Sequence, residues 1–204
     1  MPGTAAAGKS GGLNRPGESD ALWFGGLFAI LLASRLCHAG VIWTEETLPL
    51  AAAQQVLDHG KTLYRDVWFD KPPLTALAYL LWGAETGWIL RVAGALHAWL
   101  SCWVAYRLAL SLWGRTEALA ASGLLAFSLI FYLPSALIPL ASDIWMLLPH
   151  LAAVWMAVEG RQLAAGALAG IEFLFNPKGL FIEAACVVFA TRSLLPLRLG
   201  LLLQ

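Results

Sequence analysis

Charged residues are scarce in this 204-residue sequence: Asp, Glu, Lys and Arg make up 13% of it, against about 25% in typical soluble domains. The 13 basic and 13 acidic residues cancel to a formal net charge of zero, so the chain has no basic field that would attract nucleic acid. Cysteine is also scarce, and Cys37, Cys102 and Cys186 all fall in apolar runs, where cysteine behaves as a small buried hydrophobe. The composition therefore excludes a nucleic-acid-binding protein, a disulfide framework and a cysteine metal site.

Apolar residues dominate instead, at 59% of the chain with ten tryptophans and a mean hydropathy of +0.70. A helix needs about 20 mainly apolar residues to cross a bilayer. Six runs approach that length and predict an all-α integral membrane protein, a polytopic bundle of about six transmembrane helices over residues 21–43, 88–110, 118–133, 144–158, 163–175 and 180–195. We expect residues 1–20 to form a disordered cytoplasmic leader, 21–195 the transmembrane domain, and 196–204 the start of a truncated seventh span.

The first run is predicted to be a retained anchor, because it is too long for a signal peptide and no small-residue cleavage site follows it. The distribution of Lys and Arg among the connections favours a cytoplasmic N-terminus in a multi-pass protein of the plasma (inner) membrane. The acidic residues gather on the opposite, outer side: Glu45, Glu46, Asp58, Asp66, Asp70, Glu85 and Asp143. The outer face is therefore where we expect the function.

The longest polar insert, residues 44–87, separates the first two apolar runs. Pro49 suits a first helical turn, and apolar residues then recur at helical spacing until Gly60 ends the pattern. Pro72 and Pro73 exclude a helix at the preceding residue, and a second helix is predicted over 74–82. The insert should thus form an outer loop with two short amphipathic helices at the membrane interface.

The order of motifs in this insert resembles the first outer loop of GT-C glycosyltransferases. An acidic pair follows the first apolar run, a helix ends in glycine, and Tyr64-Arg65-Asp66 precedes Lys71 and the proline pair. The resemblance is strongest to prokaryotic members that use polyprenyl-phosphate sugars, such as the protein mannosyl, aminoarabinose and galacturonosyl transferases. Further similar positions follow in order: Trp88, Leu90 and Arg91; Tyr106 and Arg107 before Leu112, Gly114 and Arg115; Ser142 and Asp143; and Gly170 to Phe175 followed by Asn176, Pro177, Lys178 and Gly179.

The resemblance implies an inverting transfer of a sugar from a polyprenyl-phosphate donor to a glycan, lipid or protein acceptor on the outer (periplasmic) face. Glu45 and Glu46 are the candidate carboxylates that activate or orient the acceptor. Family members usually have Asp and then Glu here, so Glu45 has one extra methylene, a reach longer by about 1.5 Å. Without the resemblance, two acids at the end of a span would be read as solvated residues that help to position the interface.

Asp143 is the third candidate catalytic residue, although an acid in the first turn of a helix is also favoured by the helix dipole, with Ser142 as its cap. Two carboxylates allow a shared divalent cation but do not require one, and no other cofactor is predicted. The cations expected to bind the donor phosphate are Arg65, Lys71, Arg91 and Lys178, each of which could instead extend to lipid headgroups. Tyr64, Asp66 and Asp70 complete the predicted substrate loop.

Two other functions fit the same sequence. A carrier or flippase for a lipid-linked sugar would have the same partners, but transporters place their charges near the bilayer midplane, whereas most charges here lie in an outer loop. The chain could also be a catalytically inactive GT-C fragment or subunit. Among the intramembrane charges, Arg35 is predicted to pair with Glu172 or Glu183, because an unpaired charge is costly in a bilayer.

Overall fold

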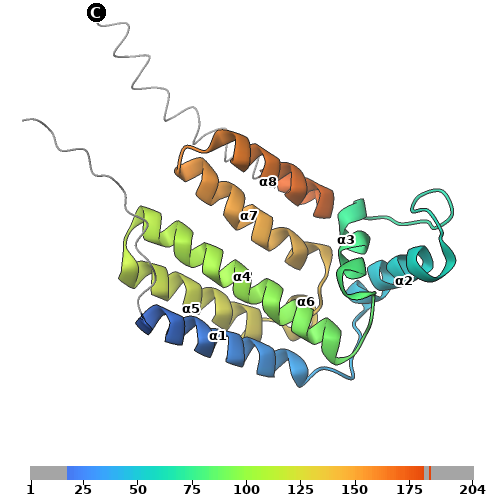
Figure 1. Ribbon diagram of the computed structural model, residues 1–204, viewed down its shortest axis with the longest axis horizontal. Helices are drawn as coiled ribbons and strands as arrows, with labels where there is room; N and C mark the ends of the chain where they lie inside the picture. The colour runs from blue at the N-terminus through green and yellow to red at the C-terminus, as the bar shows by residue number, and fades with distance from the viewer. Residues whose placement is uncertain (1–17, 182–183, 185–204) are drawn as a thin grey trace, which may run out of the picture.

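The computed structural model describes residues 18–181 and 184, and helices dominate this part of the chain (Figure 1). No strand occurs among these residues, only an isolated bridge between Leu63 and Val67. The elements are α1 (Glu18–Leu36), α2 (Thr44–His59), α3 (Pro73–Leu77), the 3₁₀ helix η1 (Ala78–Trp82), α4 (Trp88–Leu112), α5 (Arg115–Phe131), α6 (Pro134–Leu137), α7 (Ser142–Val158), α8 (Gln162–Phe175) and the 3₁₀ helix η2 (Pro177–Gly179).

Helix α4 is the centre of the bundle, since it packs against α1, α5 and α7, and α7 in turn packs against α8. These five helices run side by side, whereas α2 and α3 project from one end (Figure 1). Chain direction alternates from helix to helix, so the end of α1, the start of α4, the end of α5, the start of α7 and the end of α8 all meet at the end that carries α2 and α3. We call this end of the molecule the loop end.

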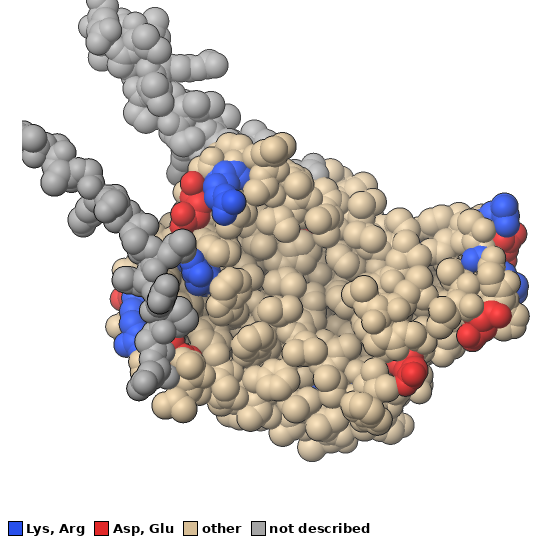
Figure 2. All heavy atoms as spheres, in the orientation of Figure 1, with Lys and Arg blue, Asp and Glu red and all other residues tan. Residues whose placement is uncertain are grey.

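Two helices in the described part of the chain, 19–36 and 88–112, are long and apolar enough to cross a membrane. Charged residues lie mainly at the two ends of the face shown in Figure 2, with an uncharged surface between them. The remaining predicted spans over 118–133, 144–158 and 163–175 coincide with α5, α7 and α8, which have 17, 17 and 14 residues. These lengths correspond to about 21–26 Å at 1.5 Å per residue, so six membrane crossings stay a prediction. The sixth predicted span lies almost entirely outside the described residues.

The outer loop contains the two predicted helices, with one change of boundary. Helix α2 begins at Thr44 rather than near Pro49, which lies inside the helix, so the acidic pair occupies the first turn. It ends at Gly60, whose φ of 61° is the left-handed conformation that glycine adopts without strain. Pro73 begins α3, which continues into η1 up to Trp82.

The far end of the bundle is closed by polar contacts between α1, α4 and α5. Asp20, 4% exposed, accepts hydrogen bonds from the Tyr106 hydroxyl at 3.0 Å and from Arg115 Nη2 at 2.6 Å. Arg107 stacks over the ring of Trp155 at 4.8 Å and so links α4 to α7. These contacts fix the helices relative to one another far from the loop end.

Two residues differ from the sequence-based expectations. Arg35 does not pair with Glu172, one of its two predicted partners: its Nη2 donates to the Leu137 carbonyl at 3.4 Å, while Glu172 Oε1 lies 3.0 Å from His150 Nδ1. The shorter first helix also leaves Cys37 beyond its end and exposed. Glu183 and Cys186 lie outside the described residues.

Candidate active site

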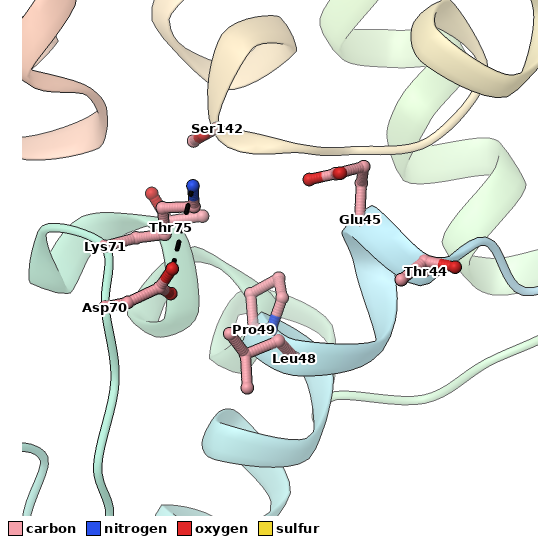
Figure 3. Close-up of a pocket in the computed structure, with 8 residues that line it drawn as sticks. All are labelled: Thr44, Glu45, Leu48, Pro49, Asp70, Lys71, Thr75 and Ser142. Carbon is pink, nitrogen blue, oxygen red and sulfur yellow. Dashed lines mark ion pairs between the residues drawn. The ribbon is translucent and has the colours of Figure 1, made fainter.

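A cavity of about 250 Å³ opens at the loop end, between the outer loop and the start of α7. Eight residues line it: Thr44, Glu45, Leu48, Pro49, Asp70, Lys71, Thr75 and Ser142. Glu45 and Lys71 approach from opposite sides, and Ser142 lies between them on the third side (Figure 3). Segments separated by about a hundred residues therefore meet around a space with hydroxyl, carboxylate and ammonium groups.

The acidic pair divides between this pocket and the protein core. Glu45 is exposed and its carboxylate points into the pocket (Figure 3), whereas Glu46 is fully buried. Successive residues of an α-helix point about 100° apart, so adjacent side chains in the first turn of α2 face different surroundings. The structure thus places the two carboxylates in distinct environments.

Glu46 forms a two-point ion pair with Arg91 of α4. Arg91 Nη1 and Nη2 donate to Glu46 Oε1 and Oε2 at 2.8 and 2.7 Å, and the two side chains are 1% and 0% exposed. Glu46 Oε1 also accepts from the Leu140 amide at 2.9 Å, and Arg91 Nη2 donates to the Val41 carbonyl at 2.7 Å. The Arg91 guanidinium lies 5.1 Å from the centre of the Trp43 ring. Neither charged group lines the pocket.

Lys71 enters the pocket from a loop that is folded by its own contacts. Tyr64 lies in the turn formed by residues 62–67 and has a left-handed backbone conformation, with a φ of 68°. Its hydroxyl donates a hydrogen bond to the Lys71 carbonyl at 2.7 Å. Partial burial raises the pKa of the Tyr64 phenol, a shift in the direction that favours its protonated, hydrogen-bond-donating form. The Lys71 ammonium lies 3.9 Å from Asp70, a loose ion pair within the pocket (Figure 3).

Arg65 and Asp66 lie at the tip of this loop and not in the pocket. Arg65 donates through Nε and Nη2 to the two Asp66 oxygens at 3.1 and 2.8 Å, and its side chain is 74% exposed. Arg65, and then the Thr62 amide that donates to the same carboxylate, hold the pKa of Asp66 below its usual value. The contacts of this pair are therefore local to the loop tip.

Asp143 and Lys178 form a second polar cluster beside the pocket. Lys178 Nζ donates to both Asp143 oxygens at 2.9 and 3.1 Å, and both side chains are more than half exposed. Asn176 Nδ2 donates to Asp143 Oδ1 at 2.6 Å and to the hydroxyl of Ser142 at 3.3 Å. The described residues contain no cluster of three or more His, Cys, Asp or Glu side chains suited to a metal ion.

A family model described as dolichyl-phosphate-mannose-protein mannosyltransferase matches residues 70–196, which are 127 of the 204 residues. The chain belongs to this family. No protein with a curated description and no solved structure matches it. Membership of this mannosyltransferase family confirms the resemblance to GT-C glycosyltransferases, which use lipid-linked sugar donors, and together with the apolar helices it indicates a membrane protein.

The match to the mannosyltransferase family includes four of the eight pocket residues but not the four that α2 contributes. Asp70, Lys71, Thr75 and Ser142 lie within the matched residues, whereas Glu45 precedes them. The structure brings these two parts together, because Glu46 of α2 accepts hydrogen bonds from the Leu140 amide at 2.9 Å and from Arg91, both within the matched residues. Residues 44–49, which precede the matched region, thus form one side of the pocket, and the matched region forms the other.

Sequence reasoning did not find the residues that hold the connection from α6 to α7, residues 138–141, and the first turn of α7, which delivers Ser142 to the pocket. The Tyr79 hydroxyl donates to the Leu140 carbonyl at 3.0 Å, and His97 Nε2 contacts the Ile144 carbonyl at 2.8 Å. Both side chains are buried, at 0% and 6% exposure. No sequence signal marks them, because each acts through a backbone atom far away in the chain.

Proposed function

We propose that this protein is a membrane glycosyltransferase that moves a sugar from a polyprenyl-phosphate donor to a glycan, lipid or protein acceptor on the outer (periplasmic) face, with inversion. The observation that carries the proposal is the arrangement of Glu45 and Lys71 on opposite sides of one pocket. The transfer needs a carboxylate near the acceptor and a cation near the leaving phosphate. Family membership supports the same class of reaction.

In this proposal Glu45 is the general base. The acceptor hydroxyl attacks the anomeric carbon from the side opposite the phosphate, the bond from that carbon to the phosphate oxygen breaks, and Glu45 takes the hydroxyl proton. Glu45 is suited to this role because it is exposed to the pocket and, in the described residues, forms no ion pair within 4.0 Å.

Lys71 is proposed to bind the departing phosphate. Its ammonium is only loosely paired with Asp70 at 3.9 Å, so a phosphate can replace that carboxylate at hydrogen-bond distance. Lys178 is proposed to bind the phosphate more weakly than Lys71, because its ammonium already donates to both oxygens of Asp143. Arg65, at the loop tip beside Asp66, is proposed to contact lipid headgroups near the donor rather than its sugar phosphate.

Glu46 and Arg91 are proposed to position the site instead of contacting substrate. Their buried ion pair fixes the first turn of α2, which carries Glu45. Through the Leu140 amide it also fixes the segment that ends at Ser142. Asp143, which accepts a hydrogen bond from the buried Asn176, is proposed to orient the acceptor beside Ser142.

The direct test is reconstitution of the purified protein in liposomes with polyprenyl-phosphate donors of mannose, aminoarabinose and galacturonic acid. A threonine-rich peptide and lipid A serve as acceptors, and mass spectrometry detects the products. Glu45→Gln should lower kcat by at least about 100-fold, the scale of general-base catalysis. Glu85→Gln is the matched control, because Glu85 is an exposed acid of the same loop outside the pocket. Near-normal turnover by Glu45→Gln would remove Glu45 from this role.

The carrier and the inactive subunit are separated by the same preparation. A carrier moves labelled donor lipid between leaflets without any glycosylated product, and an inactive subunit does neither. Product formation by the unmodified protein with at least one donor and acceptor supports the transferase. Absence of glycosylated product with every donor and acceptor pair, whether or not the protein binds dolichyl phosphate, would refute the transferase proposal.

A further inference from the structure

Asn176 joins the end of α8 to the start of α7 at the edge of the pocket, and nothing above assigns it a role. It follows the last residue of α8, is 7% exposed, and its side chain makes three hydrogen bonds. A buried amide with both polar atoms engaged can fix the orientation of its partners.

The direction of the amide is set by the local backbone. The Lys178 amide donates to Asn176 Oδ1 at 3.1 Å, which assigns the oxygen to η2 and leaves the Nδ2 hydrogens for α7. One hydrogen is then donated to Asp143 Oδ1 at 2.6 Å and the other to Ser142 Oγ at 3.3 Å. The opposite orientation would place the amide oxygen against a carboxylate.

This arrangement determines what Ser142 offers to the pocket. Because its oxygen receives the Asn176 hydrogen, the hydroxyl hydrogen of Ser142 is directed elsewhere, and within the described residues it has no acceptor. We propose, building on the proposed transferase function, that Asn176 is a positioning residue: it makes Ser142 a hydrogen-bond donor toward a substrate hydroxyl in the pocket and holds Asp143 beside it. The substrate hydroxyl belongs to the donor sugar or to the acceptor.

The backbone around Asn176 is held by contacts that do not use its amide. The rings of Phe175 and Trp145 stack at 5.5 Å, and the Thr75 hydroxyl donates to the Phe175 carbonyl. The Asn176 amide nitrogen of the backbone donates to the Glu172 carbonyl at 2.9 Å. Truncation of the side chain should therefore release Ser142 and Asp143 while the end of α8 stays in place.

The test uses the full chain in liposomes with the donor and acceptor pair that gives most product. Asn176→Ala should lower kcat/KM by about 10-fold to 100-fold, the scale of losing a hydrogen bond to a charged group together with a neutral one. Asn176→Asp has nearly the same size and keeps the acceptor for the Lys178 amide, but has no Nδ2 hydrogens, so it should lose at least as much. Gln54→Ala is the control, because Gln54 donates an amide hydrogen bond to Ala84 outside the pocket and its loss should leave kcat/KM unchanged.

A purely structural role is separated by kinetics and by a mutant cycle. In a protein that already carries Ser142→Ala and Asp143→Ala, adding Asn176→Ala should lower kcat/KM by less than about twofold, because the groups that Asn176 positions are already gone. Equal losses in both backgrounds would overturn the proposal. A change in the acceptor KM assigns the hydroxyl to the acceptor, and a change in the donor KM assigns it to the donor sugar.

The outcomes also separate this inference from the proposed function. An active unmodified protein with normal kcat/KM in Asn176→Ala and Asn176→Asp would overturn the role of Asn176 alone. No product from the unmodified protein with any donor would overturn both. If Asn176→Ala does not insert or fold, Asn176→Asp gives the same test.

Discussion

Removing Glu46 should destabilise the protein far more than removing any other acid of the outer loop. Glu46→Ala leaves the Arg91 guanidinium, 1% exposed, without its carboxylate, and leaves the Leu140 amide without its acceptor. Breaking one side of a buried ion pair costs about 3–5 kcal/mol. An unsatisfied buried amide can add about 1–3 kcal/mol where water cannot reach it. We therefore expect a loss of at least about 3 kcal/mol in the free energy of unfolding.

That loss can be measured as a change in melting temperature. For chains of 150–250 residues, 1 kcal/mol corresponds to about 2–4 °C, so Glu46→Ala should lower the Tm by roughly 6–20 °C for a loss of about 3–5 kcal/mol. The assay is thermal unfolding in detergent micelles, followed by the intrinsic fluorescence of the ten tryptophans. Glu45→Ala is the adjacent control, because its carboxylate faces the pocket and should change the Tm by less than about 2 °C.

A second variant separates the charge from the hydrogen bonds. Glu46→Gln keeps one acceptor for the Leu140 amide but removes the charge opposite Arg91, so its Tm should lie between that of the unmodified protein and Glu46→Ala. Glu46→Leu combined with Arg91→Met should recover part of the loss, because a buried ion pair can be replaced by apolar residues of similar volume. A Tm of Glu46→Ala within about 2 °C of the unmodified protein would refute the structural reasoning.

Two further predictions concern the loop that carries Lys71. Lys71→Gln should raise the KM for the lipid-linked donor by about tenfold or more, the scale of one charge-assisted hydrogen bond. Lys61→Gln should leave this KM unchanged, because Lys61 is an exposed residue of the same loop outside the pocket. Equal donor KM values for the two variants would exclude phosphate binding by Lys71. Tyr64→Phe removes the hydrogen bond to the Lys71 carbonyl and should raise the same KM by a smaller factor of about 2–10, which steady-state kinetics with varied donor will measure. A Tyr64→Phe donor KM equal to that of the unmodified protein would show that the loop holds Lys71 without this contact.

The general form of the outer loop could be predicted because its signals are local. Gly60 ends α2 and Pro73 begins α3, both through their own backbone preferences. The sequence predicts too late a start for α2, because Pro49 suits a first helical turn, whereas it lies in the interior of the helix. Proline inside a helix is uncommon because it removes one backbone hydrogen bond, so the sequence alone favoured the shorter helix.

The partners of buried charges could not be predicted in the same way. The cost of an isolated intramembrane charge predicts a carboxylate partner for Arg35, Glu172 or Glu183, but in the described residues Arg35 contacts the Leu137 carbonyl and Glu172 contacts His150. Each pairing depends on how helices far apart in sequence are rotated about their axes, which composition and periodicity do not specify. In the sequence Asn176 is only part of a motif, since its contacts with Ser142 and Asp143 form when α7 and α8 pack together.

The acidic pair shows why a sequence motif does not by itself identify which of its residues faces a pocket. Glu45 and Glu46 follow the same apolar run and have the same chemistry, yet one step of about 100° around the helix directs the first carboxylate to the pocket and the second to Arg91. The second carboxylate then reaches the Leu140 amide, two residues before Ser142 on another wall of the pocket. A pair that looks redundant in the sequence therefore divides into one carboxylate that faces the pocket, where we propose that it acts as the base, and one that joins two walls of that pocket.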